Sequence, residues 1–281
     1  MSMKRKIMAL LVSFACCHNI MAQAVYTPQD SIRIEEILQQ IKQNKSGNDI
    51  CSIAAKFTGT PYIAATLDST KCERLVVNTR QVDCTTFVES VVALSLTALQ
   101  KGNFVDYCNN LQKLRYRNAR CGRYPDRLHY ISQWVDDNNS KGIMEEIITP
   151  AHTATQELNL NFMSRNPDSY PQLKNDTATI GRISEYEAPY RNVKVKYIPK
   201  EILNGSKAAL SIENGDILAI VTSIEGLDVT HVGFGYWIDN RLHLIHASSN
   251  KGSVIIDPVP LYDYMKTKKK NLGIRVIRVI H

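Results

Sequence analysis

The sequence predicts an α+β domain in which helices precede a largely antiparallel β-sheet. In the first hundred residues, apolar side chains recur every three or four positions, which is typical of helices. After Asn214 the pattern changes to period two, which is typical of strands. A cysteine stands at the start of the longest apolar helical pattern. This order predicts N-terminal helices packed on a sheet made by the C-terminal strands.

The first 24 residues have the composition of a secretory signal peptide. Lys4, Arg5 and Lys6 precede an apolar run, and small residues around Ala22 and Ala24 form a cleavage region. The segment predicts export to the periplasm or the cell exterior, and it leaves residues 25–281 as a single domain. No later run of about 18 apolar residues predicts a transmembrane segment.

The exported chain is only mildly basic. Removing Lys4, Arg5 and Lys6 lowers the formal net charge from +7 to +4. The one basic run, residues 266–270, is typical of a solvated surface. We therefore expect no nucleic-acid partner.

Two helices are expected before the cysteine. Thr27-Pro28-Gln29-Asp30 supplies a cap, a first-turn proline and an acidic third position, and an apolar face follows. A shorter helix is expected near residues 50–57. It ends at Gly59-Thr60-Pro61-Tyr62, a turn signal that places Tyr62 on an irregular segment.

Cys84 is a candidate nucleophile because the segment Asp83-Cys84-Thr85 delivers it to a helix N-terminus. Unpaired N–H groups there favour thiolate, and such positions lower a cysteine pKa to roughly 3.5 to 7.5. The helix continues through an apolar series to Lys101-Gly102, a stop signal. The alternative is a cysteine that packs in the core as a small hydrophobe.

The number of cysteines after the signal segment is odd, so they cannot all form disulfides with one another. Five cysteines follow the signal segment: Cys51, Cys72, Cys84, Cys108 and Cys121. In an oxidising compartment four could pair, in three possible connectivities, and Cys84 would remain free. The alternative is that none of them pair.

Residues 103–213 are expected to form a large insertion that makes a ligand-binding wall, because periodicity weakens there while Tyr, Arg, Asn and Pro accumulate. Tyr130 and Trp134 have helical spacing, so Trp134 is either a core residue or a platform for a sugar ring. Arg127 and His129 are expected to face outward. Ser164 lies in a later polar stretch of the same segment.

Strands are expected at residues 216–223, 230–238, 241–247, 253–256 and 273–280, with a tight hairpin at Asp239-Asn240. In the second strand His231 shares a face with Gly233 and Gly235, which leaves open space beside a base. The alternative for His231 is a solvated strand face.

The third strand carries two histidines on opposite faces, so only one can point at His231. We expect His246 to be the histidine that points at His231, and His243 is the alternative. Histidines three apart on one strand cannot bind one metal, and no zinc motif follows the signal segment, so we expect no metal or cofactor.

In order along the chain, Gly59-Thr60-Pro61-Tyr62, Val82-Asp83-Cys84-Thr85, His231-Val232-Gly233 and Ile245-His246-Ala247-Ser248 resemble the motifs of NlpC-type papain-like cysteine peptidases that cut bacterial peptidoglycan. Further segments, including residues 124–130 and 161–164, resemble a narrower branch of N-acetylmuramoyl-L-alanine amidases. The resemblance covers nearly the whole exported chain and implies a papain-like core.

The resemblance implies Cys84 as nucleophile, His231 as general base, His246 as the residue that orients it, and Tyr62 near the oxyanion. Two departures stand out: the usual Asp-Cys-Ser-Gly reads Asp83-Cys84-Thr85-Thr86, and a glycine pair is replaced by Ala64-Ala65. In relatives that trim free peptides, the aspartate helps to hold the substrate's amino terminus. Asp83 is therefore expected to be structural in an amidase.

The expected reaction is cleavage of the amide between the muramic lactyl group and L-alanine in soluble peptidoglycan fragments, with Arg127 a candidate partner for a stem carboxylate. Tyr130, Trp134, His129, Ser164 and Thr85 complete the candidate binding residues. One alternative is an endopeptidase of the same fold, cutting after L-alanine or one bond further on. The other is a wall-binding protein without activity.

Overall fold

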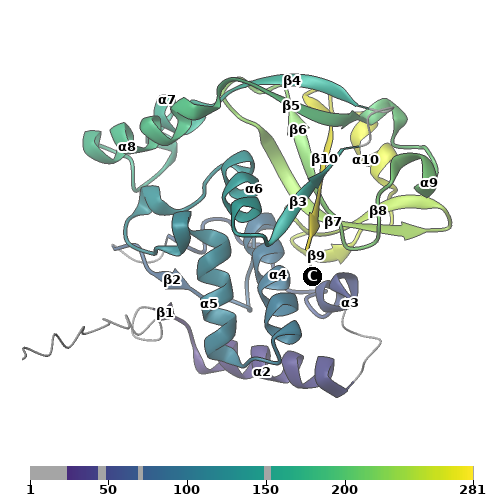
Figure 1. Cartoon of the computed structure of the whole chain (residues 1–281), viewed down its shortest axis with the longest axis horizontal. Coiled ribbons are helices and arrows are strands. Elements are labelled where there is room, and N and C mark those ends of the chain that lie inside the picture. Colours follow the sequence, from purple (N-terminus) through teal and green to yellow (C-terminus); the bar gives the residue numbers. More distant parts are fainter. Residues whose placement is uncertain (1–23, 44–48, 69–71, 149–152, 281) are drawn as a thin grey trace, which may run out of the picture.

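An antiparallel β-sheet of eight strands organises the chain (Figure 1). The structure is a computed structural model that describes residues 24–43, 49–68, 72–148 and 153–280, so the predicted signal segment before Ala24 lies outside the described residues. The sheet strands are β3 (Met144–Ile147), β4 (Ala154–Asn159), β5 (Arg191–Pro199), β6 (Ile217–Thr222), β7 (Val229–Ile238), β8 (Arg241–Ser248), β9 (Ser253–Ile256) and β10 (Asn271–Val279).

The strand order is β4-β5-β10-β6-β7-β8-β9, and β3 also pairs with β10. Every pairing in this sheet is antiparallel. Asp239 and Asn240 join β7 to β8 with positive φ angles of 46° and 58°, the conformation that a tight hairpin requires. The five C-terminal strands therefore lie within a few residues of the positions that period two predicts.

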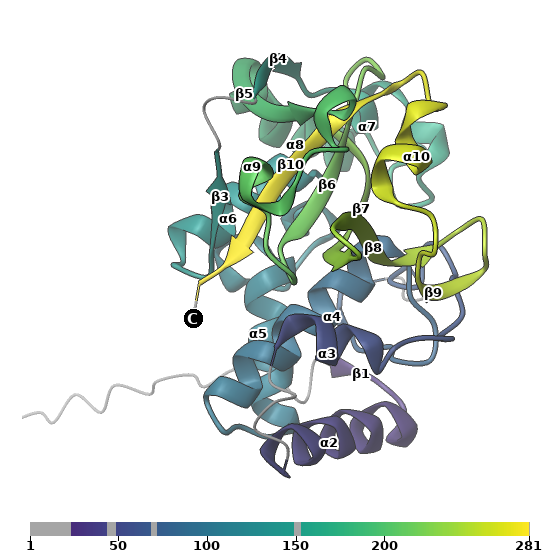
Figure 2. The ribbon, with the colours of Figure 1, turned by 90° about the vertical axis from the view of Figure 1, so that its right-hand side faces the viewer.

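Helices cover one face of the central strands (Figures 1 and 2). Of the N-terminal helices, α3 (Ile50–Ala55) and α4 (Cys84–Leu99) contact β7 and β8, while α2 (Pro28–Gln43) and α5 (Phe104–Arg115) pack on α4. Phe87 of α4 stands edge-on to Phe234 of β7, with ring centroids 5.6 Å apart. Phe87 also packs against Phe57 at 5.9 Å. These buried rings fix α4 against the sheet, since aromatic pairs add directional preference to area burial.

The opposite face of the sheet is covered by α9 (Lys207–Leu210) and α10 (Leu261–Lys266), which pack with Leu242, Leu244 and Leu218 in a second apolar cluster. A third cluster lies among α6 (Ile131–Ser140), α7 (Phe162–Arg165) and α8 (Thr177–Glu187). A short parallel pair, β1 (Ala24–Val25) with β2 (Leu75–Val76), stands apart from the main sheet.

Residues 103–213 contribute elements to the main core and sheet, which a separate inserted wall would not do. Helix α5 packs in the main core, and β3 and β5 both pair with β10. Only part of residues 103–213 therefore stands outside the sheet and its helices, and an insertion over this range stays a prediction. β5 was not expected, although Val193, Val195 and Tyr197 alternate with Lys194 and Lys196 as in a half-exposed strand.

None of the considered disulfides forms. Cys51, Cys84, Cys108 and Cys121 are free thiols, and every pairing of the four candidate cysteines would use at least one of them. Burial raises the pKa of both Cys51 and Cys108 to about 12, so these two thiols behave as packed hydrophobes.

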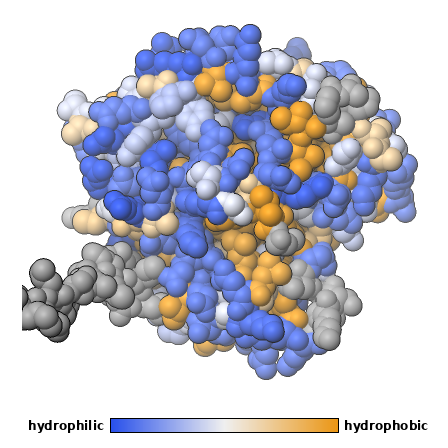
Figure 3. Space-filling view, in the orientation of Figure 1, coloured by the Kyte–Doolittle hydropathy of each residue, from blue (hydrophilic) through white to orange (hydrophobic). Residues whose placement is uncertain are grey.

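Within the described ranges, no helix combines the length and apolar character needed to cross a bilayer. Figure 3 shows a mixed face on which polar residues surround a band of apolar ones. Exposed apolar side chains are normal on folded proteins, so the band alone assigns no partner.

Gly233 provides a test of the packing between β7 and β8. A Cβ at this position would lie 2.8 Å from the His246 Cβ and 2.9 Å from the Ile245 carbonyl oxygen, and the carbonyl belongs to the sheet backbone. We expect Gly233→Ala to lower the free energy of unfolding by about 1–3 kcal/mol, the usual cost of overpacking. Urea denaturation measures the change.

Gly181→Ala is the matched control. Gly181 lies inside α8, and a Cβ there would meet nothing within 4 Å, so alanine should gain about 0.5–1 kcal/mol. Equal effects of the two substitutions would contradict the close approach at Gly233.

Candidate active site

Cys84 is the first residue of α4, and its position is set by the cap before it. The Asp83 Oδ1 accepts a hydrogen bond from the Thr86 N–H at 2.8 Å, and the Asp83 N–H donates to the Thr86 Oγ1 at 2.9 Å. Such a reciprocal box satisfies two helix-end donors and fixes the helix start. The half-buried Cys84 therefore occupies a defined place at the helix N-terminus.

The cysteine lies against β7. The backbone of Val232 and the backbone and side chain of Thr85 lie close enough to the Cys84 sulfur to lower its pKa, and the Thr85 Oγ1 is 4.0 Å from it. Val232 directly follows His231, so the sulfur and this histidine belong to the same small region. Tyr62 reaches the region from a third segment, held by a bridge to Val82 and a 2.8 Å hydrogen bond to the Gly252 carbonyl.

His231 follows an irregularity in the sheet. The β6–β7 register shifts between Ile220, which faces His231, and Val221, which faces Val229, so Thr230 is an extra residue. Bulges of this kind re-aim side chains and concentrate next to active sites. The His231 ring remains half-buried at the end of the regular pairing.

His231 and His246 are in direct contact. The His231 Nε2 and the His246 Nδ1 are 2.6 Å apart, and the two rings are nearly perpendicular at 87°. His246 is buried, and its Nε2 lies 3.3 Å from Asp257 Oδ2. A carboxylate on one nitrogen of an imidazole fixes the proton on that side and leaves the other nitrogen to accept.

Asp257 is the functional residue that sequence reasoning missed. It is buried, and its Oδ1 also accepts from the Val259 N–H at 2.9 Å. Ile255 pairs with His246 across β8 and β9, so Asp257 lies two positions along the same face. Only the register of β8 against β9, which cannot be read from the sequence, could have indicated this position.

His243 takes a different place from His246. Its Nδ1 is 2.9 Å from the Asp257 carbonyl oxygen, and the side chain is buried. The alternative assignment of His243 as the partner of His231 therefore has no support in the geometry.

The electrostatics differ from the expectation of a depressed cysteine pKa. Burial and the adjacent Asp83 carboxylate raise the pKa of Cys84 to about 11, against hydrogen bonds that lower it. Burial, with smaller contributions from His246 and Lys268, lowers the pKa of His231 to about 3. At neutral pH the unliganded site therefore holds a thiol and a neutral imidazole, because burial outweighs the helix N-terminus.

Two predicted binding residues are buried instead. Trp134 is 2% exposed and Tyr130 is 3% exposed, so neither offers a surface to a ligand. The Tyr130 hydroxyl donates to Glu187 Oε1 at 2.7 Å and accepts from the Met163 N–H at 2.8 Å, which ties α6 to α7 and α8. Their predicted binding role is corrected to packing. Ser164 takes part in the same junction through its N–H, 3.2 Å from Glu187 Oε1.

Arg127 and His129 do not face outward as expected. The Arg127 side chain is 11% exposed, and its guanidinium bridges Asp68 at 2.9 Å and Glu73 at 2.8 Å. Two carboxylates already compensate its charge. The His129 Nε2 is 2.9 Å from the Tyr124 carbonyl oxygen, and burial, then the nearby Arg127, lowers its pKa to about 3.

Across the described ranges, no group of three or more His, Cys, Asp or Glu side chains is arranged to hold a metal ion. The chemistry available at the site is that of a thiol, two imidazoles, a carboxylate and a phenol. Such a set suits acyl transfer through a covalent thioester.

A family model described as AmiA-like, N-acetylmuramoyl-L-alanine amidase-like, matches residues 52–274. The chain belongs to this family of amidase-like proteins. A crystal structure of an N-acetylmuramoyl-L-alanine amidase from Bacteroides uniformis is 37% identical, with a TM-score of 0.78, over 84% of this chain and 100% of that one.

A crystal structure of a putative xylanase from Bacteroides fragilis is 38% identical, with a TM-score of 0.76, over 81% of this chain and 99% of that one. A Legionella pneumophila protein, 23% identical with a TM-score of 0.66, shares the fold over 90% of this chain and 95% of its own. No curated protein matches the sequence.

The Asp83 carboxylate gives a test of the cysteine's electrostatics. Asn can cap a helix about as well as Asp, but it carries no charge, so Asp83→Asn should lower the pKa of Cys84. Each unit by which the pKa of Cys84 falls raises its thiolate fraction about tenfold at neutral pH. We expect several-fold faster alkylation of Cys84 by iodoacetamide, followed as a function of pH with Cys84→Ala as background.

Asp176→Asn is the control, because Asp176 caps α8 in the same way, far along the chain from Cys84. An unchanged pH profile in Asp83→Asn would show that Asp83 does not govern the thiol.

Proposed function

We propose that the protein is a cysteine amidase that cleaves the amide between the lactyl group of N-acetylmuramic acid and L-alanine in peptidoglycan fragments. The observation that carries the proposal is the chain of contacts from His231 to His246 and Asp257 beside Cys84, in a member of the amidase-like family. The name of the Bacteroides uniformis relative supports the same bond. The helix-borne cysteine and the histidine strand support an NlpC-type papain-like core.

The first step is attack on the lactyl carbonyl. The neutral His231 accepts the Cys84 proton as the sulfur attacks, so no free thiolate is needed beforehand. The negative oxygen that forms is stabilised by the Cys84 backbone N–H and the Tyr62 hydroxyl. Burial, and to a smaller extent the Asp83 carboxylate, raises the pKa of Tyr62 to about 12, so the phenol keeps its proton and donates it in a hydrogen bond.

Collapse of the intermediate breaks the C–N bond. His231 gives the accepted proton to the nitrogen, L-alanine leaves with a free amine, and the lactyl carbonyl remains as a thioester on Cys84. His231 then takes a proton from water, whose oxygen attacks the thioester. As the C–S bond breaks, His231 returns this proton to the sulfur, which restores the thiol and releases muramic acid, whose carboxyl group ionises in water. His246, held by Asp257, stabilises the imidazolium in both steps.

One feature supports an amidase over an endopeptidase. The Asp83 carboxylate is occupied by the Thr86 N–H and hydroxyl, at 2.8 and 2.9 Å, so it serves the helix start rather than a substrate amine. The xylanase name of the Bacteroides fragilis relative fits this chain less well, because glycoside hydrolysis uses a pair of carboxylates across the scissile bond. The amidase-like family also favours action outside the cytoplasm, as the predicted signal segment does.

Product analysis tests the bond that is cut. Incubation with a defined muropeptide should release a peptide that begins with L-alanine and a muramyl sugar with a free lactyl carboxylate, both identified by mass spectrometry. Cys84→Ala should release neither. Sugar still joined to L-alanine, with the stem cut further on, would instead establish an endopeptidase.

Substitutions along the histidine chain test the mechanism. We expect His231→Ala to lower kcat by about 10²–10⁴, the usual contribution of a general base.

Asp257→Asn should lower kcat by about 10² with little change in KM, because it misplaces the ring pair without touching substrate. Asp239→Asn, in the exposed hairpin, is the control. A change in KM alone for Asp257→Asn would argue against the positioning role.

A further inference from the structure

A cavity of about 820 Å³ lies outside the set of residues proposed for catalysis. The turn after α5 forms most of its wall, with Arg117, Arg120 and Arg123, and Tyr186 of α8 closes another side. Neither Cys84 nor His231 nor His246 lines it. Its volume is within the range of small-ligand sites.

The cavity has an excess of positive charge. Among the residues that the structure describes, neither Arg117 nor Arg120 forms an ion pair with a carboxylate. Arg123 contacts Asp126, the acidic residue of the lining, at 3.4 Å with its side chain 63% exposed. Asp126 is also bound by the Arg123 N–H at 2.9 Å. Three guanidinium groups are thus opposed by a single carboxylate.

The Arg117 side chain is held in place, but not all of its N–H donors have a hydrogen-bond partner. Its guanidinium lies over the Tyr186 ring, 4.1 Å from the centroid, and its Nη2 donates to Gln133 Oε1 at 3.3 Å. The Arg117 Nε is buried without a hydrogen-bond partner, and so is the Gln112 Oε1 on the same wall. A charged group that is buried and only partly paired is costly, and a nearby anion offsets that cost.

The turn that carries these arginines is strained. Asn118 and Ala119 have φ angles of 51° and 57°, a left-handed conformation that costs a residue such as alanine about 1–2 kcal/mol. Gln112 holds it through a 2.9 Å hydrogen bond from its Nε2 to the Ala119 carbonyl, and Asp137 accepts from the Asn118 N–H at 3.2 Å. Strain of this kind is concentrated at ligand sites. Here the two left-handed residues lie between Arg117 and Arg120 and separate them along the cavity wall.

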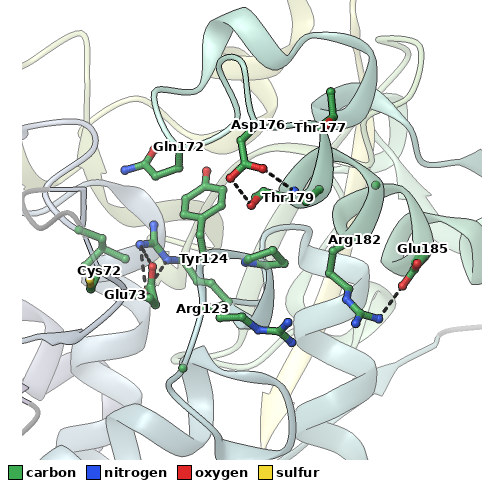
Figure 4. Close-up of a pocket in the computed structure, with 16 residues that line it drawn as sticks. Cys72, Glu73, Arg123, Tyr124, Gln172, Asp176, Thr177, Thr179, Arg182 and Glu185 are labelled. Carbon is green, nitrogen blue, oxygen red and sulfur yellow. Dashed lines mark hydrogen bonds and ion pairs between the residues drawn. The ribbon is translucent and has the colours of Figure 1, made fainter.

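A second cavity, of about 690 Å³, adjoins the first along Gly122 and Arg123. Figure 4 shows the Tyr124 ring beside Gln172 and Asp176, with Arg182 and its partner Glu185 on the neighbouring helix. The Arg127 guanidinium lies 5.0 Å from the Tyr124 ring centroid, and the Gln172 Oε1 is buried without a partner. The adjoining space leaves room for a ligand larger than a single anionic group.

We infer that the cavity lined by Arg117, Arg120 and Arg123 is a second binding site, which takes an anionic ligand through a carboxylate or phosphate group. Guanidinium groups match both groups with paired hydrogen bonds, and the Tyr186 ring already orients one of them. The inference depends on the charge and geometry of this cavity and is independent of the amidase proposal.

Calorimetric titration at low ionic strength tests the site, with inorganic phosphate and citrate as separate probes. We expect saturable binding of at least one probe, with amide chemical-shift changes at Gly122 and Tyr186. The double variant Arg117→Gln/Arg120→Gln should bind at least tenfold more weakly. Stronger binding of citrate assigns a carboxylate ligand, and stronger binding of phosphate assigns a phosphorylated one; either result supports the site.

The charge-matched control is Arg165→Gln/Arg191→Gln, which removes two exposed arginines that do not line the cavity and should bind as the unaltered protein does. Arg120→Glu is a second variant, because Arg120 is exposed and its substitution spares the Arg117 contacts with Tyr186 and Gln133. Cys84→Ala should bind normally. Equal weakening in the control, unchanged binding in both cavity variants, or no binding of either probe would overturn the inference.

Discussion

The contact between the start of α4 and the bulged end of β7 is the constraint on which the site depends. Phe87 and Phe234 lock the helix against the strand, and the Asp83–Thr86 box fixes where the helix begins. The sulfur then lies beside the backbone of Val232, which lowers the Cys84 pKa and directly follows His231. A helix shifted by one residue would rotate its first side chain by about 100°, since a turn has 3.6 residues. Precise capping and core packing are therefore requirements of the chemistry.

Burial determines how this site can react. The same desolvation that raises the pKa of Cys84 lowers that of His231, so both groups are neutral before substrate arrives. In the proposed mechanism, charge then develops only when the proton moves during attack. The buried His246–Asp257 pair is placed to stabilise the positive imidazole at that moment, in surroundings where water does not weaken the interaction. A thiol kept neutral in this way is also less exposed to oxidation.

The middle of the chain combines structural and recognition features in different places. Tyr130 and Glu187 tie its helices together, and Arg127 binds two carboxylates, so the residues that looked most suited to a ligand mainly hold the structure. Arg117 and Arg120, which form no ion pair with a carboxylate among the described residues, come from the short strained turn after α5. An arginine's sequence position does not reveal whether its charge is already matched, because its acidic partners lie far away along the chain.

The sequence by itself determined the helix that begins at Cys84, the antiparallel strands after Asn214, the hairpin at Asp239-Asn240 and the candidate pair His231 and His246. Each depends on local signals: a cap, an apolar period, or a turn that accepts positive φ. Tertiary structure alone decided the pairing of β3 and β5 with β10, the burial of Trp134 and the position of Asp257. It also decided the direction of the Cys84 pKa, because desolvation and cross-strand neighbours depend on segments that meet only when the chain folds.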